Sequence, residues 1–134
     1  MHVSLAVLAD YALLDKADKL SIIGIFGQIG SAVAPIRHPK MTLVIVFEST
    51  RADYNRQREL EIDITDQDGK PIVQKISGQV GINGDPAVPP SVNIIINLED
   101  VTFPDFGAYT VSIFLNGDIQ KTVRLDVVKM DPAA

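Results

Sequence analysis

Residues 103–127 constrain the fold more than any other stretch of the chain. From Tyr109 to Leu115 apolar and polar residues largely alternate, and a second alternating run follows Asn116-Gly117. Period-two alternation of β-branched and aromatic residues is typical of strands with one buried face. Asn-Gly between two such runs is a strong signal for a tight turn. The sequence therefore predicts an antiparallel β-hairpin near its C-terminus.

The register of this hairpin depends on its turn. Opposed residues of an antiparallel pair share a face, and a plain two-residue turn would oppose Tyr109 to Arg124. A three-residue connection, or a two-residue turn followed by a bulge, opposes Tyr109 to Leu125 and brings the apolar sets together. We expect one of these two arrangements. Lys121 then lies opposite Ile113, at a sheet edge where a lysine discourages strand addition.

The approach to the hairpin resembles a known structural motif. The run Asp105-Phe106-Gly107-Ala108-Tyr109 is similar to the tyrosine corner of immunoglobulin-like sandwiches. The resemblance implies that the Tyr109 hydroxyl bonds back to the backbone, with Asp105 and Gly107 shaping the corner. The chain has no cysteine and no tryptophan, so the disulfide and tryptophan of antibody domains are absent. The alternative is an ordinary turn followed by a core tyrosine.

Strand patterns and turn signals alternate through the rest of the chain. We expect strands at about 2–10, 20–30, 41–48, 58–65, 71–82 and 92–99, and a connection over 31–40 because of its two prolines. A three-residue loop over 67–69 would oppose Ile64 to Ile72 and Leu60 to Ile76. Together with the hairpin, about eight strands predict an all-β fold, an immunoglobulin-like antiparallel β-sandwich. We expect a single domain over 1–130 and a short C-terminal tail, 131–134.

Composition excludes several classes of partner. A net charge of −5 and a pI near 4.8 disfavour nucleic-acid binding, which needs clustered lysine and arginine. No stretch approaches the roughly 20 apolar residues of a membrane helix, and the N-terminus lacks the features of a signal peptide. The absence of cysteine excludes disulfides and thiolate metal sites and is consistent with a cytoplasmic protein.

No catalytic or cofactor motif is present, so we expect a non-enzymatic protein without a cofactor or metal. His2 and His38 are far apart in the sequence and do not indicate a metal site. The alternative function is a ligand-binding sandwich that takes calcium or a glycan at its end loops. The candidate calcium ligands are Asp66, Asp68, Asp85 and Asp105, and the candidate glycan-stacking aromatics are Tyr11, Tyr54 and Phe106.

The strongest functional indication is an excess of apolar residues. Segments 20–29 and 41–47 carry hydrophobic residues on both strand faces, whereas a two-layer sandwich buries one face of each strand. Either another part of the chain covers the second face, or it is a protein interface, most simply for self-association as a homo-oligomer. The possible interface residues are Ile23, Ile25, Ile29, Val44 and Val46.

The chain as a whole resembles an uncharacterised family of short bacterial proteins. The resemblance rests on the segments 3–12 and 19–26 and on Phe-Pro-x-x-Gly-x-Tyr at 103–109. It implies a compact β-sandwich and no assigned activity. We therefore expect a protein-interaction or assembly module whose cellular role is open.

Overall fold

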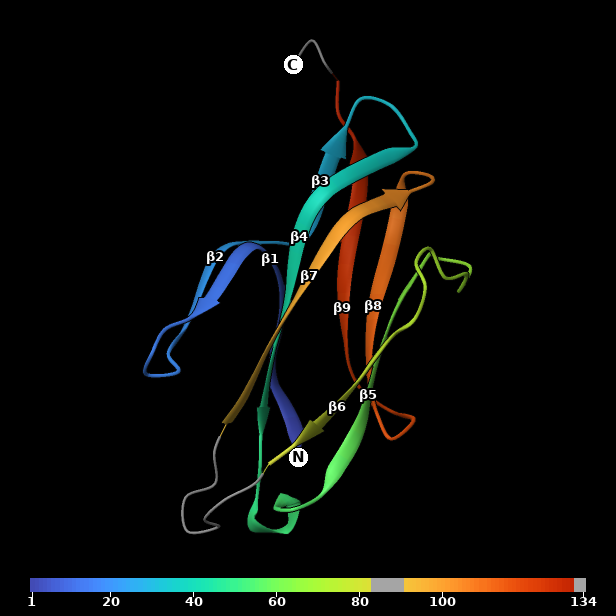
Figure 1. Cartoon of the computed structure of the whole chain (residues 1–134). Helices are drawn as coiled ribbons and strands as arrows, with labels where there is room; N and C mark the ends of the chain where they lie inside the picture. Colours follow the sequence, from blue (N-terminus) through green and yellow to red (C-terminus); the bar gives the residue numbers. More distant parts are fainter. Residues whose placement is uncertain (83–90, 132–134) are drawn as a thin grey trace.

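The computed structural model describes residues 1–82 and 91–131, and in this part of the chain nine strands form two packed sheets (Figure 1). The predicted all-β sandwich is confirmed. The candidate ligand Asp85 and residues 132–134 of the predicted tail lie outside the described residues.

The sheets differ in size. The four-stranded sheet has the order β2(Leu20–Phe26), β1(His2–Leu14), β4(Ile36–Glu48) and β7(Ser91–Phe103). The five-stranded sheet has the order β3(Gln28–Ser31), β9(Asp118–Lys129), β8(Gly107–Leu115), β5(Gln57–Thr65) and β6(Ile76–Gly81). A single 3₁₀ turn, η1(Arg51–Asp53), lies between β4 and β5.

The segment predicted as one strand over 20–30 is two strands in different sheets. β2 pairs antiparallel with β1, whereas β3 pairs in parallel with β9. Gly27 lies between them, and its carbonyl accepts a 2.9 Å hydrogen bond from the Asp126 N–H. The apolar pattern runs through both strands because each has a buried face, so it did not reveal the change of sheet.

The C-terminal hairpin has the second of the two predicted turn arrangements. Asn116 and Gly117 have φ of 48° and 83°, the positive values that a type I′ turn needs. A bulge then follows between Ile113 and Phe114 of β8. Beyond the bulge the predicted pairs are present, including Tyr109 with Leu125 and Ile113 with Lys121.

The β5–β6 connection follows the prediction only near its turn. The Ile72 N–H donates to the Ile64 carbonyl at 2.9 Å, as the three-residue loop requires. The register has shifted by two residues in β6, where Leu60 faces Gly78 and Ile62 faces Ile76. The strand predicted over 71–82 is therefore shorter, because 72–75 bulge out of the ladder.

Strand β4 begins earlier than the prolines suggested. Residues 36–40, predicted as part of a connection, already pair with β7. Pairing with β1 begins only at Thr42, so β4 is locally an edge at Pro39. A proline is tolerated at an edge because its missing N–H would have faced no partner strand.

The core lies between the two sheets. The odd-numbered residues 41–47 of β4 face alternate residues of β5, β8 and β9. Phe103 and Tyr109 meet edge to face, with ring centroids 4.9 Å apart. Full burial of a large apolar side chain contributes about 1.5–3 kcal/mol, so this layer carries most of the stability. The largest fully buried side chains are Phe47, Phe103, Leu8, Met41, Leu43, Ile45, Ile62, Ile64, Ile113 and Leu125.

Candidate interaction surfaces

The predicted interface residues separate into exposed and buried sets. Ile23 and Ile25 of β2 are 57% and 62% exposed. Val46 of β4 is half-buried. Ile29 is 8% exposed and Val44 is fully buried, so neither offers its side chain to a partner. The expectation for these two residues is corrected.

Val44 is buried although it faces away from the inter-sheet core. It lies on a central strand, opposite Val7 of β1 and Ile95 of β7. The β1–β2 hairpin bends back along the sheet (Figure 1), so that Leu14 and Asp18 line one hollow with residues 91–93 at the start of β7. The chain itself therefore encloses part of this second apolar face.

The exposed isoleucines lie on a free strand edge. Among the described residues, β2 pairs only with β1, and its sequence from Leu20 to Phe26 contains no charged residue. Ile23 pairs with Tyr11 and Ile25 pairs with Ala9, so the two isoleucines share a face with Tyr11. Strand edges of this kind are usually protected by lysine, proline or a bulge. β2 contains no lysine or proline, although Gly24 near its centre has φ of 73° and lies against the Asp10 carboxylate of β1.

A second surface lies where β6 and β7 form neighbouring edges of opposite sheets. An apolar cleft of about 290 Å³ opens there. Leu60, Ile62 and Ile76 line it from the five-stranded sheet, and Ile94 and Ile96 line it from β7. No local sequence pattern indicated this cleft, because it forms between edge strands of opposite sheets.

Carboxylates border the outer side of β6. Glu59, Glu61 and Asp63 alternate along β5, away from the core. The Lys75 ammonium lies 3.1 Å from Glu61 Oε2 and 4.0 Å from Asp63 Oδ2. The hydrogen bond from Lys75 holds the pKa of Glu61 below its usual value, and the same bond raises the pKa of Lys75. One ammonium therefore faces three carboxylates.

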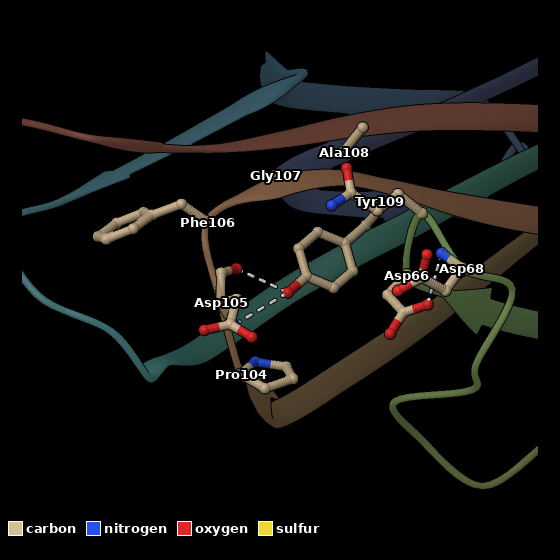
Figure 2. Close-up of a pocket in the computed structure, with 9 residues that line it drawn as sticks. Asp66, Asp68, Pro104, Asp105, Phe106, Gly107, Ala108 and Tyr109 are labelled. Atoms are coloured by element: carbon tan, nitrogen blue, oxygen red, sulfur yellow. Dashed lines mark hydrogen bonds between the residues drawn. The ribbon is translucent and has the colours of Figure 1, made fainter.

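Three of the candidate calcium ligands line the end-loop pocket, with the Tyr109 side chain between Asp105 and the other two (Figure 2). Asp66, Asp68 and Asp105 line a hollow of about 70 Å³ with Phe106 and Tyr109. The Asp66 carboxylate already accepts the N–H groups of Asp68 and Lys70, both at 2.9 Å. Within residues 1–82 and 91–131, no three metal-ligating side chains are grouped so that they could hold an ion.

Tyr109 forms the wall of this pocket and is tied to the preceding corner. Its hydroxyl donates to the Asp105 carbonyl oxygen at 2.7 Å and accepts from the Asp105 N–H at 3.2 Å (Figure 2). Gly107 has φ of 143°, a conformation that favours glycine. The side-chain hydroxyl thus fixes the backbone where the chain enters β8.

The histidines and the other candidate aromatics do not meet. His2 Nε2 lies 3.4 Å from the Glu48 carboxylate in an exposed pair. His38 stacks obliquely on Phe26, with ring centroids 5.8 Å apart. The Lys40 ammonium lies 5.5 Å from the centroid of the Tyr11 ring. Each of these groups has a local partner of its own, and they form no common site.

A buried ion cluster was not predicted. Asp53 is 2% exposed, and its carboxylate contacts the Met1 ammonium at 2.9 Å and the Arg58 guanidinium at 2.7 Å. Burial alone would raise the pKa of Asp53, but the Thr50 N–H bond, the ammonium and the guanidinium together lower it. Thr50, Asp53 and Arg58 are close in the sequence, but Met1 is 52 residues from Asp53, so no local pattern could indicate that contact. It secures the start of β1 against η1.

Comparisons with known proteins give a family without a function. No helix within the described residues has the length and hydrophobicity needed to cross a bilayer. No curated protein matches the chain. A family model described as a family of unknown function, DUF6941, matches residues 4–128. The chain belongs to this family.

Proposed function

We propose that this protein is a non-enzymatic assembly module that self-associates through the edge of β2. The observation that carries the proposal is the pair of exposed isoleucines, Ile23 and Ile25, on an uncharged strand with one unpaired edge. An unpaired edge presents backbone N–H and C=O groups to a second chain. Two copies that pair β2 with β2 would extend the four-stranded sheet across a two-fold axis.

The chemistry of β2 favours its own copy as partner. A strand without charge meets an identical strand without repulsion, although the whole chain has a net charge of −5. Tyr11 of β1 lies beside Ile23 on the same face and is also exposed, which widens the apolar strip. Burial of such area stabilises an association by roughly 25 cal/mol per Å² before the entropic cost of association.

Light scattering coupled to size-exclusion chromatography tests the proposal. The wild type should elute as a multiple of 14.6 kDa, and Ile25→Lys and Ile23→Lys should elute near 14.6 kDa while still unfolding in a cooperative thermal transition. Ile119→Lys is a matched control, because Ile119 on β9 is 57% exposed like Ile23. The control should assemble like the wild type. A wild-type mass of 14.6 kDa at high concentration overturns the proposal.

We further infer that the sandwich is immunoglobulin-like. The order β1–β4–β7 corresponds to strands A, B and E of that fold, and β5–β8–β9 corresponds to C, F and G. β6 then occupies the position of C′. The hydrogen bonds between Tyr109 and Asp105 lie at the start of β8, where the tyrosine corner of the fold is found. The strand order and the hydrogen bonds of Tyr109 are independent observations, and both support an immunoglobulin-like sandwich.

A further inference from the structure

The cleft between β6 and β7 opens onto the core and is lined mainly by apolar side chains. Its volume, about 290 Å³, is at the lower limit of the ~300–1,000 Å³ typical of small-molecule pockets. Ile76, Ile94 and Ile96 are only half-buried there, although they pack against the core. The cleft has the size and lining to take a few aliphatic side chains.

The edge of β6 offers backbone groups beside this cleft. β6 is six residues long and, among the described residues, pairs only with β5, apart from the parallel bridge between Tyr54 and Ile82 just beyond its end. Such a strand spans about 20 Å at 3.3 Å per residue. Gly78 faces the same side as Leu60, and a Cβ placed on it would contact no atom within 4 Å. The cleft face of β6 is therefore also open at its middle.

The outer side of β6 is acidic. Ser77 pairs with Glu61 and Gln79 pairs with Glu59, so only short or neutral side chains separate the carboxylates from the edge. A second hollow, of about 280 Å³, is lined by Glu59 and residues 77–79. A strand added beside β6 would alternate its side chains between the apolar cleft and this acidic face.

We propose that the β6 edge binds an extended segment of another protein in which apolar residues alternate with lysine or arginine. The segment adds to the five-stranded sheet as a further antiparallel or parallel strand, the mode known as β-strand addition. Its apolar side chains enter the cleft above Ile94 and Ile96, and its basic side chains lie over Glu59 and Glu61. The charge of the outer face selects a basic partner.

This site is separate from the proposed self-association edge. β2 and β6 are edges of different sheets, and β2 contains no lysine or arginine that could complement Glu59 and Glu61. A second copy that inserted β2 here would add no cation beside the single Lys75 ammonium that these carboxylates share. Ile25→Lys, which should abolish assembly through β2, should leave binding at β6 unchanged.

Fluorescence anisotropy with labelled peptides tests the proposal on the full chain. The probe is Lys-Ile-Lys-Val-Lys-Ile-Lys, with Glu-Ile-Glu-Val-Glu-Ile-Glu as its charge-reversed counterpart. We expect the lysine peptide to bind at least tenfold more tightly than the glutamate peptide, and to weaken as salt rises. Hydrogen exchange should slow at amides 76–81 when the lysine peptide is bound. Equal affinities, no binding, or protection elsewhere than at β6 overturns the proposal.

Two variants locate the binding. Gly78→Leu fills the cleft from within and should weaken binding of the lysine peptide at least tenfold. The control, Thr122→Leu, adds the same side chain at an exposed position of β9 and should leave the peptide affinity unchanged. Glu59→Lys changes an exposed residue outside the core, so it can test the binding site even if Gly78→Leu disturbs folding. Glu59→Lys should lower the affinity for the lysine peptide and raise the affinity for the glutamate peptide. Unchanged affinities in a folded Glu59→Lys variant contradict the proposal.

Discussion

The two hairpins β8–β9 and β1–β2 are built from similar residues and differ in what surrounds them. β8 is flanked by β5 and β9, and every second residue from Tyr109 to Leu115 is buried. β2 has one partner strand, and its two central isoleucines are exposed. Apolar alternation therefore indicates a strand in both places, but only the neighbours decide whether its hydrophobic residues become core or surface.

The hairpins also differ in how their edges are protected. Where β9 has no neighbour other than β8, it carries Lys121 opposite Ile113 and the exposed Arg124. β2 has no charge at all. Lysine at an edge disfavours addition of another strand because its ammonium would have to be desolvated. The contrast indicates that β9 is protected against addition of another strand at this edge, whereas β2 has no charged residue to oppose it.

The largest expected effect concerns the anchor of β1. Asp53→Asn leaves the Met1 ammonium without its carboxylate, and breaking a buried ion pair costs about 3–5 kcal/mol. Because the folded-state pKa of Asp53 is lowered, its contribution is complete above the ordinary aspartate pKa and is lost as pH falls through the folded value. Urea unfolding from pH 7 to pH 2 measures this. If the free energies of unfolding of wild type and variant changed with pH in the same way, the stabilising role of the Asp53 carboxylate would be contradicted.

The next prediction tests the comparison of the hairpins directly. Leu125→Ala in β9 removes a fully buried side chain and should lower the free energy of unfolding by about 2–5 kcal/mol. Ile25→Ala in β2 removes an exposed one and should change it by less than about 0.5 kcal/mol. Denaturant unfolding of the two variants, at a concentration where the protein is monomeric, gives both values. Similar losses would show that β2 is as well packed as β9.

A smaller effect is expected at the corner before β8. Tyr109→Phe keeps the ring against Phe103 but removes both hydrogen bonds to Asp105, which should cost about 1 kcal/mol. Tyr11→Phe on β1 is the matched control, since Tyr11 is exposed, and its stability should be unchanged. Thermal unfolding of the pair measures the difference. A neutral Tyr109→Phe would mean that the ring alone fixes the corner.

The smallest effect on stability sharpens the comparison of edges. Lys121→Ile removes one of the two basic residues on this edge of β9, at an exposed position, so stability should change by less than about 0.5 kcal/mol. In the Ile25→Lys background, however, it should restore self-association, now through β9. Light scattering of the double variant reports this. A monomeric double variant would show that edge charge alone does not control assembly.

The parts of the fold that local chemistry determines were predictable. Asn116-Gly117 and the parity of Tyr109 and Leu125 gave the hairpin and its register, because a turn type and a period of two are properties of short stretches. The division of 20–30 at Gly27 was not predictable, since it depends on the pairing of β3 with β9, 98 residues further along the chain.

The same distinction applies to the surfaces. The sequence indicated a second apolar face on 20–29 and 41–47, and of the five candidate interface residues Ile23 and Ile25 are exposed, at 57% and 62%. Val44 could not be separated from them, because its cover comes from neighbouring strands rather than from its own segment. The contact of Met1 with Asp53 and the β6–β7 cleft arise between distant segments and leave no local pattern, whereas the contacts of Asp53 with Thr50 and Arg58 are local.

The parallel pairing of β3 with β9 has a mechanical consequence. β1 begins and β9 finishes at opposite ends of the sandwich (Figure 1). Tension between these ends pulls β1 along β4, and β9 along β8 and β3. The hydrogen bonds between these strands are then loaded in shear, so that they bear the force at the same time and do not break one after another. Forced unfolding is governed by the unfolding barrier. We therefore expect the sandwich to resist stretching along its strands much better than peeling of the β1–β2 hairpin from its side.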